Sequence, residues 1–242
     1  MSIVRHIPNC ITCLNLISGA VAVIYAFQDR FDKALGFIIL ASVFDFLDGF
    51  SARLLHAYSN IGKELDSLAD TVSFGLAPSL IMYNYLCGFT SGVNTYIRYI
   101  PLLLAAFSAL RLAKFNLDTR QNENFLGLPV PASALLAASL IATAGHYQEL
   151  ATPLLANNYA IPAIAVILSA LLVSEVPMFS MKFKSAKWKD NSTRYTFLGI
   201  TIPVAVILLI LKIHWTGIIF FIFTFYLLWN VTAALFRKLA HK

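Results

Sequence analysis

Long, mainly apolar runs constrain this chain more than any other feature. The first run, Ile11–Phe27, holds 17 uncharged residues, and seven further stretches of similar character follow it. A helix needs about 20 mainly apolar residues to cross the hydrocarbon core of a bilayer. Charged residues make up only 12% of the 242, and a water-soluble domain carries about 25%. The sequence therefore predicts an all-α integral membrane protein whose surface faces lipid.

We expect about eight membrane-spanning helices, which places both chain ends on one side of the membrane. Only a few residues around Lys212 and His214 separate the last two stretches, so these should form a tight hairpin. The first run follows Arg5 and His6 and could also be a secretory signal, but it fits a retained span equally well. The eight stretches are Ile11–Phe27, Ala34–Leu54, Ser67–Leu86, Val93–Leu112, Pro131–Tyr147, Leu154–Val173, Tyr195–Leu211 and Trp215–Leu235.

The lysines and arginines sort unevenly between the two sides that these spans define. The side with the chain ends carries 14 of the 18 basic residues. Because cytoplasmic loops of membrane proteins carry the excess of Lys and Arg, this side should be the cytoplasmic side of the cell membrane. The net charge of +6 then reflects topology, and we expect no nucleic-acid partner. The four basic residues on the opposite side are Arg30, Lys33, Arg98 and Lys212.

Four aspartates lie at or near the cytoplasmic ends of the second and third stretches. A carboxylate at the centre of a membrane helix costs roughly 2.5–3.5 kcal/mol. Asp45 and Asp48 are three residues apart, and Asp66 and Asp70 are four apart, so each pair lies on one helix face. Arg53 alone cannot balance four carboxylates. Divalent Mg²⁺ or Mn²⁺ can, and two such ions about 3.5–4 Å apart suit displacement at phosphorus.

The spacing around these acids resembles the defining motif of the CDP-alcohol phosphotransferase family, with no position missing. Three further stretches resemble its membrane-embedded phosphatidylserine synthase branch, although Lys114 stands where that branch has Arg. The motif is Asp45-x2-Asp48-Gly49-x2-Ala52-Arg53-x8-Gly62-x3-Asp66-x3-Asp70. The further stretches are Pro8-Asn9-x2-Thr12-x2-Asn15, Leu110-Arg111-Leu112-Ala113-Lys114-Phe115-Asn116 and Phe125-x-Gly127-Leu128-Pro129-x-Pro131-Ala132.

The resemblance implies one membrane-embedded domain over residues 1–242, with its catalytic motif at residues 45–70. It implies a six-helix core, to which a hairpin at about residues 195–236 would be extra, and a homodimer among membrane lipids. The implied reaction converts CDP-diacylglycerol and L-serine to phosphatidylserine and CMP, in a cavity open to the cytoplasm.

The resemblance also implies a role for each residue that matches a motif. Asp45, Asp48, Asp66 and Asp70 would hold two divalent ions, and Asp70 would also take the proton of the serine hydroxyl. The residues that would contact the CDP-lipid are Asn9, Thr12, Gly49, Arg53 and Ser59. Arg111 and Asn116 are candidates for positioning the acceptor.

Two alternative functions stay open at this point. Within the family, the acceptor could be glycerol 3-phosphate, an inositol phosphate or choline, since the stretch Leu110–Asn116 supplies two basic residues. In a different class, intramembrane acids can line the path of a cation or proton transporter. A transporter predicts acids spread through the membrane depth and often an inverted repeat, whereas these four cluster at one end.

Overall fold

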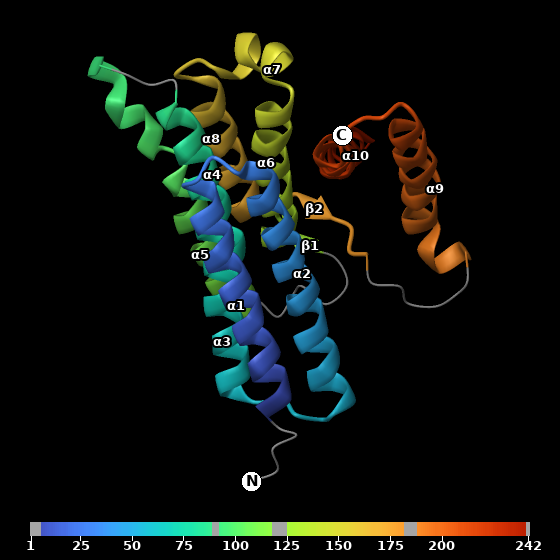
Figure 1. Ribbon diagram of the computed structural model, residues 1–242. Coiled ribbons are helices and arrows are strands. Elements are labelled where there is room, and N and C mark those ends of the chain that lie inside the picture. Colours follow the sequence, from blue (N-terminus) through green and yellow to red (C-terminus); the bar gives the residue numbers. More distant parts are fainter. Residues whose placement is uncertain (1–5, 89–91, 118–124, 182–187, 241–242) are drawn as a thin grey trace.

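The computed structural model describes residues 6–88, 92–117, 125–181 and 188–240, and these are almost entirely helical (Figure 1). The α-helices are α1 (Ile7–Ala26), α2 (Phe31–Leu54), α3 (Asn60–Asp70), α4 (Ala77–Cys87), α5 (Leu102–Leu117), α6 (Val130–His146), α7 (Gln148–Leu155), α8 (Ala160–Val173), α9 (Trp188–Ile210) and α10 (Trp215–Ala240). A π-helical segment, η2 (Thr71–Leu76), joins α3 to α4, and a 3₁₀ segment, η3 (Gly92–Tyr99), precedes α5. Two short strands, β1 (Phe125–Leu126) and β2 (Pro177–Met178), pair antiparallel.

Helices α1 and α2 form the most extensive helix pair, and α6 packs against α2, α4 and α10. Small buried residues line the α1 face, among them Ser18, Gly19 and Ala22. Such residues let helix backbones approach closely, which is the main source of packing energy between helices in lipid. In Figure 1, α10 lies between α6 and α9, so the last two helices stand on one side of the bundle.

Five helices of the described part are long and apolar enough to cross a membrane, or six if one bent pair counts as a span. The all-α membrane fold is confirmed, but fewer spans meet this criterion than the eight stretches predicted. The reasons are local. Helix α6 has only 17 residues, and η2 divides the stretch Ser67–Leu86.

The stretch Leu154–Val173, predicted as one span, is broken near its start, because α7 and α8 meet at a bend of 77°. Asn157 makes this break: its side-chain oxygen accepts the backbone N–H groups of Tyr159 and Ala160, at 2.9 and 2.8 Å. A side-chain oxygen that accepts the first free N–H groups of a helix stabilises the start of that helix.

Part of the predicted cytoplasmic charge lies outside the described residues. This applies to Arg5, Arg120, Lys182, Lys184, Lys187 and Lys242.

Candidate functional site

Helix α3 begins outside the apolar stretch and carries two of the four aspartates. Its N-cap is Ser59, whose Oγ accepts the backbone N–H of Gly62 at 2.9 Å. The helix ends at Asp70, where the chain passes directly into η2. Short π-helical turns inside helices are frequent at functional sites, because they shift the direction of the side chains beside them.

Three of the four aspartates gather at one point. Asp45 and Asp48 come from α2 and Asp66 from α3, and one carboxylate oxygen from each lies within 4.8 Å of the other two. Asp48 is buried, and Asp66 Oδ1 is a buried atom without a hydrogen-bond partner among the described residues. An all-carboxylate set with an unpaired buried oxygen fits a hard divalent cation, which takes oxygen ligands.

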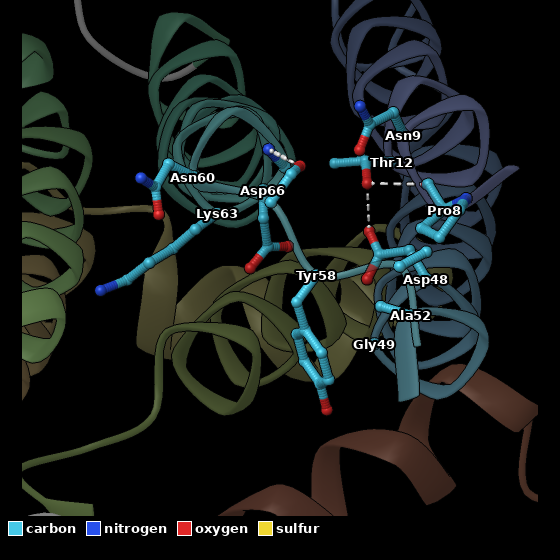
Figure 2. Close-up of a pocket in the computed structure, with 13 residues that line it drawn as sticks. Pro8, Asn9, Thr12, Asp48, Gly49, Ala52, Tyr58, Asn60, Lys63 and Asp66 are labelled. Atoms are coloured by element: carbon cyan, nitrogen blue, oxygen red, sulfur yellow. Dashed lines mark hydrogen bonds between the residues drawn. The ribbon is translucent and has the colours of Figure 1, made fainter. Parts of the chain in front are cut away.

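Helix α1 supports two of the acids through side chains one turn apart. Thr12 Oγ1 donates to Asp48 Oδ2 at 2.6 Å, a bond drawn in Figure 2. Asn15 Nδ2 donates to Asp70 Oδ1 at 3.0 Å. Asp70 is therefore turned toward α1, and it is not a member of the group of three. One face of α1 thus fixes a carboxylate on α2 and another at the end of α3.

A cavity of about 470 Å³ opens beside this cluster, between the starts of α1 and α3 and the end of α2 (Figure 2). Its size is that of a pocket for a small organic ligand. Asp48 and Asp66 both line it, so acidic and apolar surface meet in one space. The lining residues are Pro8, Asn9, Thr12, Asp48, Gly49, Ala52, Ala57, Tyr58, Ser59, Asn60, Gly62, Lys63 and Asp66.

The family model described as CDP-alcohol phosphatidyltransferase matches residues 5–174, which is well over half of the chain. The chain belongs to this family. It is the CDP-alcohol phosphotransferase family that the motif resembles, and the protein is a membrane-embedded enzyme of this group.

Relatives with curated names support the same membership. The chain is 35% identical over 185 residues to the CDP-diacylglycerol–serine O-phosphatidyltransferase of Helicobacter pylori, covering 75% of this chain and 74% of the relative. It is 36% identical over 136 residues to the enzyme of that name from Bacillus subtilis, covering 54% and 72%. The archaetidylserine synthase of Methanothermobacter thermautotrophicus is 31% identical over 179 residues, covering 70% and 68%.

In this member of the family, four of the five predicted CDP-lipid residues line the cavity: Asn9, Thr12, Gly49 and Ser59. The fifth, Arg53, is exposed and is not among the lining residues. A methyl group added at Gly49 would lie 3.8 Å from Arg53 Nη1, so the guanidinium extends along this glycine. At Gly62, the same methyl group would meet Asn9 Oδ1 at 3.0 Å. The motif glycine therefore lets α1 and α3 approach each other at the cavity.

The two predicted acceptor residues, both on α5, are not among the residues that line this cavity. Arg111 is buried, with its guanidinium 5.1 Å from the centre of the Phe115 ring. Asn116 Nδ2 donates to Ser67 Oγ at 2.8 Å, and its carbonyl accepts from Lys63 Nζ at 3.1 Å. These bonds tie the end of α5 to α3. The role of both residues stays a prediction.

The sequence reasoning gave no role to Asn15, Tyr58, Asn60 or Lys63, which the structure places in or beside the site. Three of them lie in the loop and first turn before the apolar stretch, where hydropathy gives no signal. Asn15 had a signal, since it stands three residues after Thr12 and therefore on the same face of α1. That spacing predicts that the two side chains act on the same region.

Proposed function

We propose that this enzyme transfers the phosphatidyl group from CDP-diacylglycerol to the hydroxyl of L-serine and releases CMP. The main observation that supports this proposal is the cluster of Asp45, Asp48 and Asp66 beside a cavity, in a chain that matches the family over residues 5–174. The names of the relatives from Helicobacter pylori and Bacillus subtilis support serine as the acceptor. They favour it over glycerol 3-phosphate, inositol phosphate or choline.

The cavity is the proposed site for the CDP group. Asn9 and Ser59 offer polar side-chain atoms, and Gly49 allows the close approach of a ligand to the backbone of α2. Arg53 would contact the diphosphate by turning inward from its exposed position, because a guanidinium binds phosphate oxygens in pairs. We keep Arg111 and Asn116 as proposed acceptor residues.

The acidic cluster is the proposed cation site. Asp45, Asp48 and Asp66, with Asp70, would hold Mg²⁺ or Mn²⁺. Such ions, when bound, supply positive charge to a diphosphate and to the CMP that leaves.

Asp70 is the proposed general base. A serine hydroxyl is a weak nucleophile at neutral pH and needs a base within hydrogen-bond reach. The hydroxyl oxygen forms a bond to the phosphorus that bears diacylglycerol, the bond between that phosphorus and the bridging oxygen of CMP breaks, and Asp70 receives the proton. Asn15 holds the Oδ1 atom of this carboxylate.

The membrane arrangement is also proposed. Since serine and CMP are water-soluble, the cavity should open to the cytoplasm, with both chain ends on that side of the cell membrane. Helices α9 and α10 lie beyond residue 174, where the family match ends, which supports an additional hairpin within a single domain. The family resemblance supports a homodimer, which sedimentation of the purified enzyme in detergent would test.

A competition among acceptors tests the reaction. Purified enzyme with CDP-diacylglycerol and Mn²⁺ receives labelled serine, glycerol 3-phosphate, inositol phosphate or choline in separate reactions. We expect labelled phosphatidylserine and one CMP per lipid formed. Incorporation of glycerol 3-phosphate without serine would overturn the serine assignment and keep the family.

The variant Asp70→Asn tests the base. It keeps the shape of the side chain but cannot take a proton, so kcat should fall by about 10²–10⁴-fold. Asp29→Asn is the matched control. Asp29 lies after α1 with a positive φ of 57°, which Asn tolerates, and it should keep the wild-type kcat. Full activity of Asp70→Asn, or CMP release with loss only of ion flux in vesicles, would exclude the proposed role of Asp70.

A further inference from the structure

Asn15 is a fully buried amide in the middle of a membrane helix, and the roles proposed above say only that it is bonded to Asp70. It is 0% exposed. A buried amide costs free energy unless its polar atoms are bonded. Two of its groups are bonded across a helix boundary: the side-chain Nδ2 to Asp70 Oδ1 and the backbone carbonyl to Ser73 Oγ.

These two bonds hold both sides of the junction between α3 and η2. Asp70 is the last residue of α3, and Ser73, whose Oγ donates to the Asn15 carbonyl at 2.9 Å, lies inside η2. Gly19, one turn further along α1, touches the same segment, since a methyl group there would lie 2.6 Å from Ser73 Cα. The position of Asn15 relative to Asp70 is therefore fixed by the backbone.

The orientation of the amide follows from the charge of its partner. An ionised carboxylate only accepts hydrogen bonds, so the NH₂ end of Asn15 must face Asp70. The amide oxygen of Asn15 then points elsewhere, and it is buried without a hydrogen-bond partner among the described residues. Leaving this oxygen unpaired costs about 1–3 kcal/mol, so Asn15 is not explained as a residue that only stabilises the fold.

We infer that Asn15 is a positioning residue for Asp70. Its amide holds Oδ1 of the Asp70 carboxylate and so leaves Oδ2 to receive the proton of the acceptor hydroxyl. This inference rests on the proposed function, in which Asp70 is the base. A carboxylate held by one oxygen loses rotational freedom and keeps its second oxygen in a single direction. Bound geometry of this kind lowers the barrier in the transition state and contributes little to substrate binding.

Kinetics of purified variants with CDP-diacylglycerol, serine and Mn²⁺ test this role. Asn15→Asp preserves the shape of the side chain but removes the donor, and Asn15→Ala removes the whole amide. Both should lower kcat about 10–100-fold, as for partners that orient a functional group. The KM for CDP-diacylglycerol should change less than about threefold, since Asn15 does not line the cavity.

The control is Asn84→Ala. Asn84 Nδ2 donates to the Ala26 carbonyl at 2.7 Å and to Asp29 Oδ1 at 2.8 Å, at the opposite end of α1. This variant also loses an amide bond to α1, here a partly buried one, but it should keep the wild-type kcat. Binding of CDP-diacylglycerol to each variant establishes that it is folded, and if Asn15→Ala does not bind, the isosteric Asn15→Asp carries the test.

A double variant separates this inference from the proposed function. If Asn15 acts through Asp70, Asn15→Asp should reduce kcat less than about threefold in the Asp70→Asn background. The inference is overturned if both losses multiply, or if Asn15→Asp keeps wild-type kcat while Asp70→Asn is inactive; the proposed function survives both results. Full activity of Asp70→Asn would instead overturn the proposed function, and the inference with it.

Discussion

Thr12 shows how a single hydroxyl on one helix supports a carboxylate on another. Its bond to Asp48 Oδ2 at 2.6 Å holds the carboxylate that forms the acidic cluster with Asp45 and Asp66. Thr12→Val keeps the shape and removes the donor. We expect the Mn²⁺ concentration for half-maximal activity to rise about 10–100-fold, as when the partner of a metal ligand is removed.

Ser18→Ala is the matched control for this prediction. Ser18 lies on the same helix and is buried, but its hydroxyl donates to the Leu14 carbonyl of its own helix. A titration of activity with Mn²⁺ should give the wild-type midpoint for this variant. If Thr12→Val also keeps that midpoint, the hydroxyl does not support the proposed cation site.

The residues of the site differ in how well their positions could be predicted from the sequence. The acids Asp45, Asp48 and Asp66 could be placed together, because charge in an apolar stretch is costly and helical spacing defines a face. The turn of Asp70 toward Asn15 could not be predicted in the same way. It depends on the rotation of α1 relative to α3. Packing around η2 sets this rotation, and the spacing of residues within one helix does not predict it.

At the scale of elements, the contact between α1 and η2 depends on the absence of one side chain. An added methyl group at Gly19 would lie 2.6 Å from Ser73 Cα, whereas at Gly36 in α2 it would meet nothing within 4 Å. Gly19→Ala should therefore lower the apparent Tm in detergent by roughly 3–10 °C, from an overpacking cost of about 1–3 kcal/mol.

Gly36→Ala makes the same chemical change on the neighbouring helix and serves as the control. It should keep or raise the Tm, because alanine favours a helix by about 1 kcal/mol over glycine. Equal Tm values for the two variants would show that α1 can move away from η2 at no cost.

The C-terminal hairpin, formed by α9, α10 and residues 211–214 between them, docks on α6 through a pair of histidines. The rings of His214 and His146 stack at 3.9 Å, and the backbone N–H of His214 donates to the Tyr147 hydroxyl at 2.8 Å. Burial and then the neighbouring His146 lower the pKa of His214 below its usual 6.5, with Asp32 opposing them. The folded protein thus favours the neutral ring.

A lowered histidine pKa has a definite sign for stability. The unfolded chain binds the proton more readily than the folded protein. The contribution of neutral His214 to the free energy of unfolding is therefore complete above about pH 6.5 and is lost as the pH falls below that value. The Tm of wild type should decrease from pH 7.5 to pH 5.5 more steeply than that of His214→Gln. His56→Gln, in the exposed loop after α2, should follow wild type; parallel curves for all three would contradict a role for His214.

The element boundaries that the sequence missed are those set by polar side chains. Hydropathy places the third helix at Ser67, but α3 begins at Asn60, because Ser59 caps a turn that contains Lys63 and Glu64. The bend before α8 was missed for the same reason, since Asn157 acts through hydrogen bonds within a few residues. The hairpin turn was predictable, because Lys212 interrupts two apolar stretches. In the structure Lys212 adopts a positive φ of 57°.

For the whole molecule, composition alone predicts the fold class, and the motif predicts which end holds the site. The start of α1 and the other elements that line the cavity lie at one end of the bundle in Figure 1, and α7 lies at the other. The path of α10 between α6 and α9 could not be predicted. Lipid solvates every apolar face equally, so only the complementarity of side chains decides which helix packs on which.

The excess of basic residues on one side predicts which end faces the cytoplasm. Tyr58 beside the cavity is 73% exposed, and Tyr159 in the turn before α8 is 70% exposed at the opposite end. Each tyrosine can be replaced by Cys in a background variant that carries Cys10→Ala, Cys13→Ala and Cys87→Ala. In spheroplasts, a membrane-impermeant maleimide should label Tyr159→Cys at once and Tyr58→Cys only after permeabilisation. The reverse labelling pattern would place the cavity outside the cell and contradict the predicted orientation. It would also contradict the proposed reaction, because the cavity would then be separated from serine in the cytoplasm.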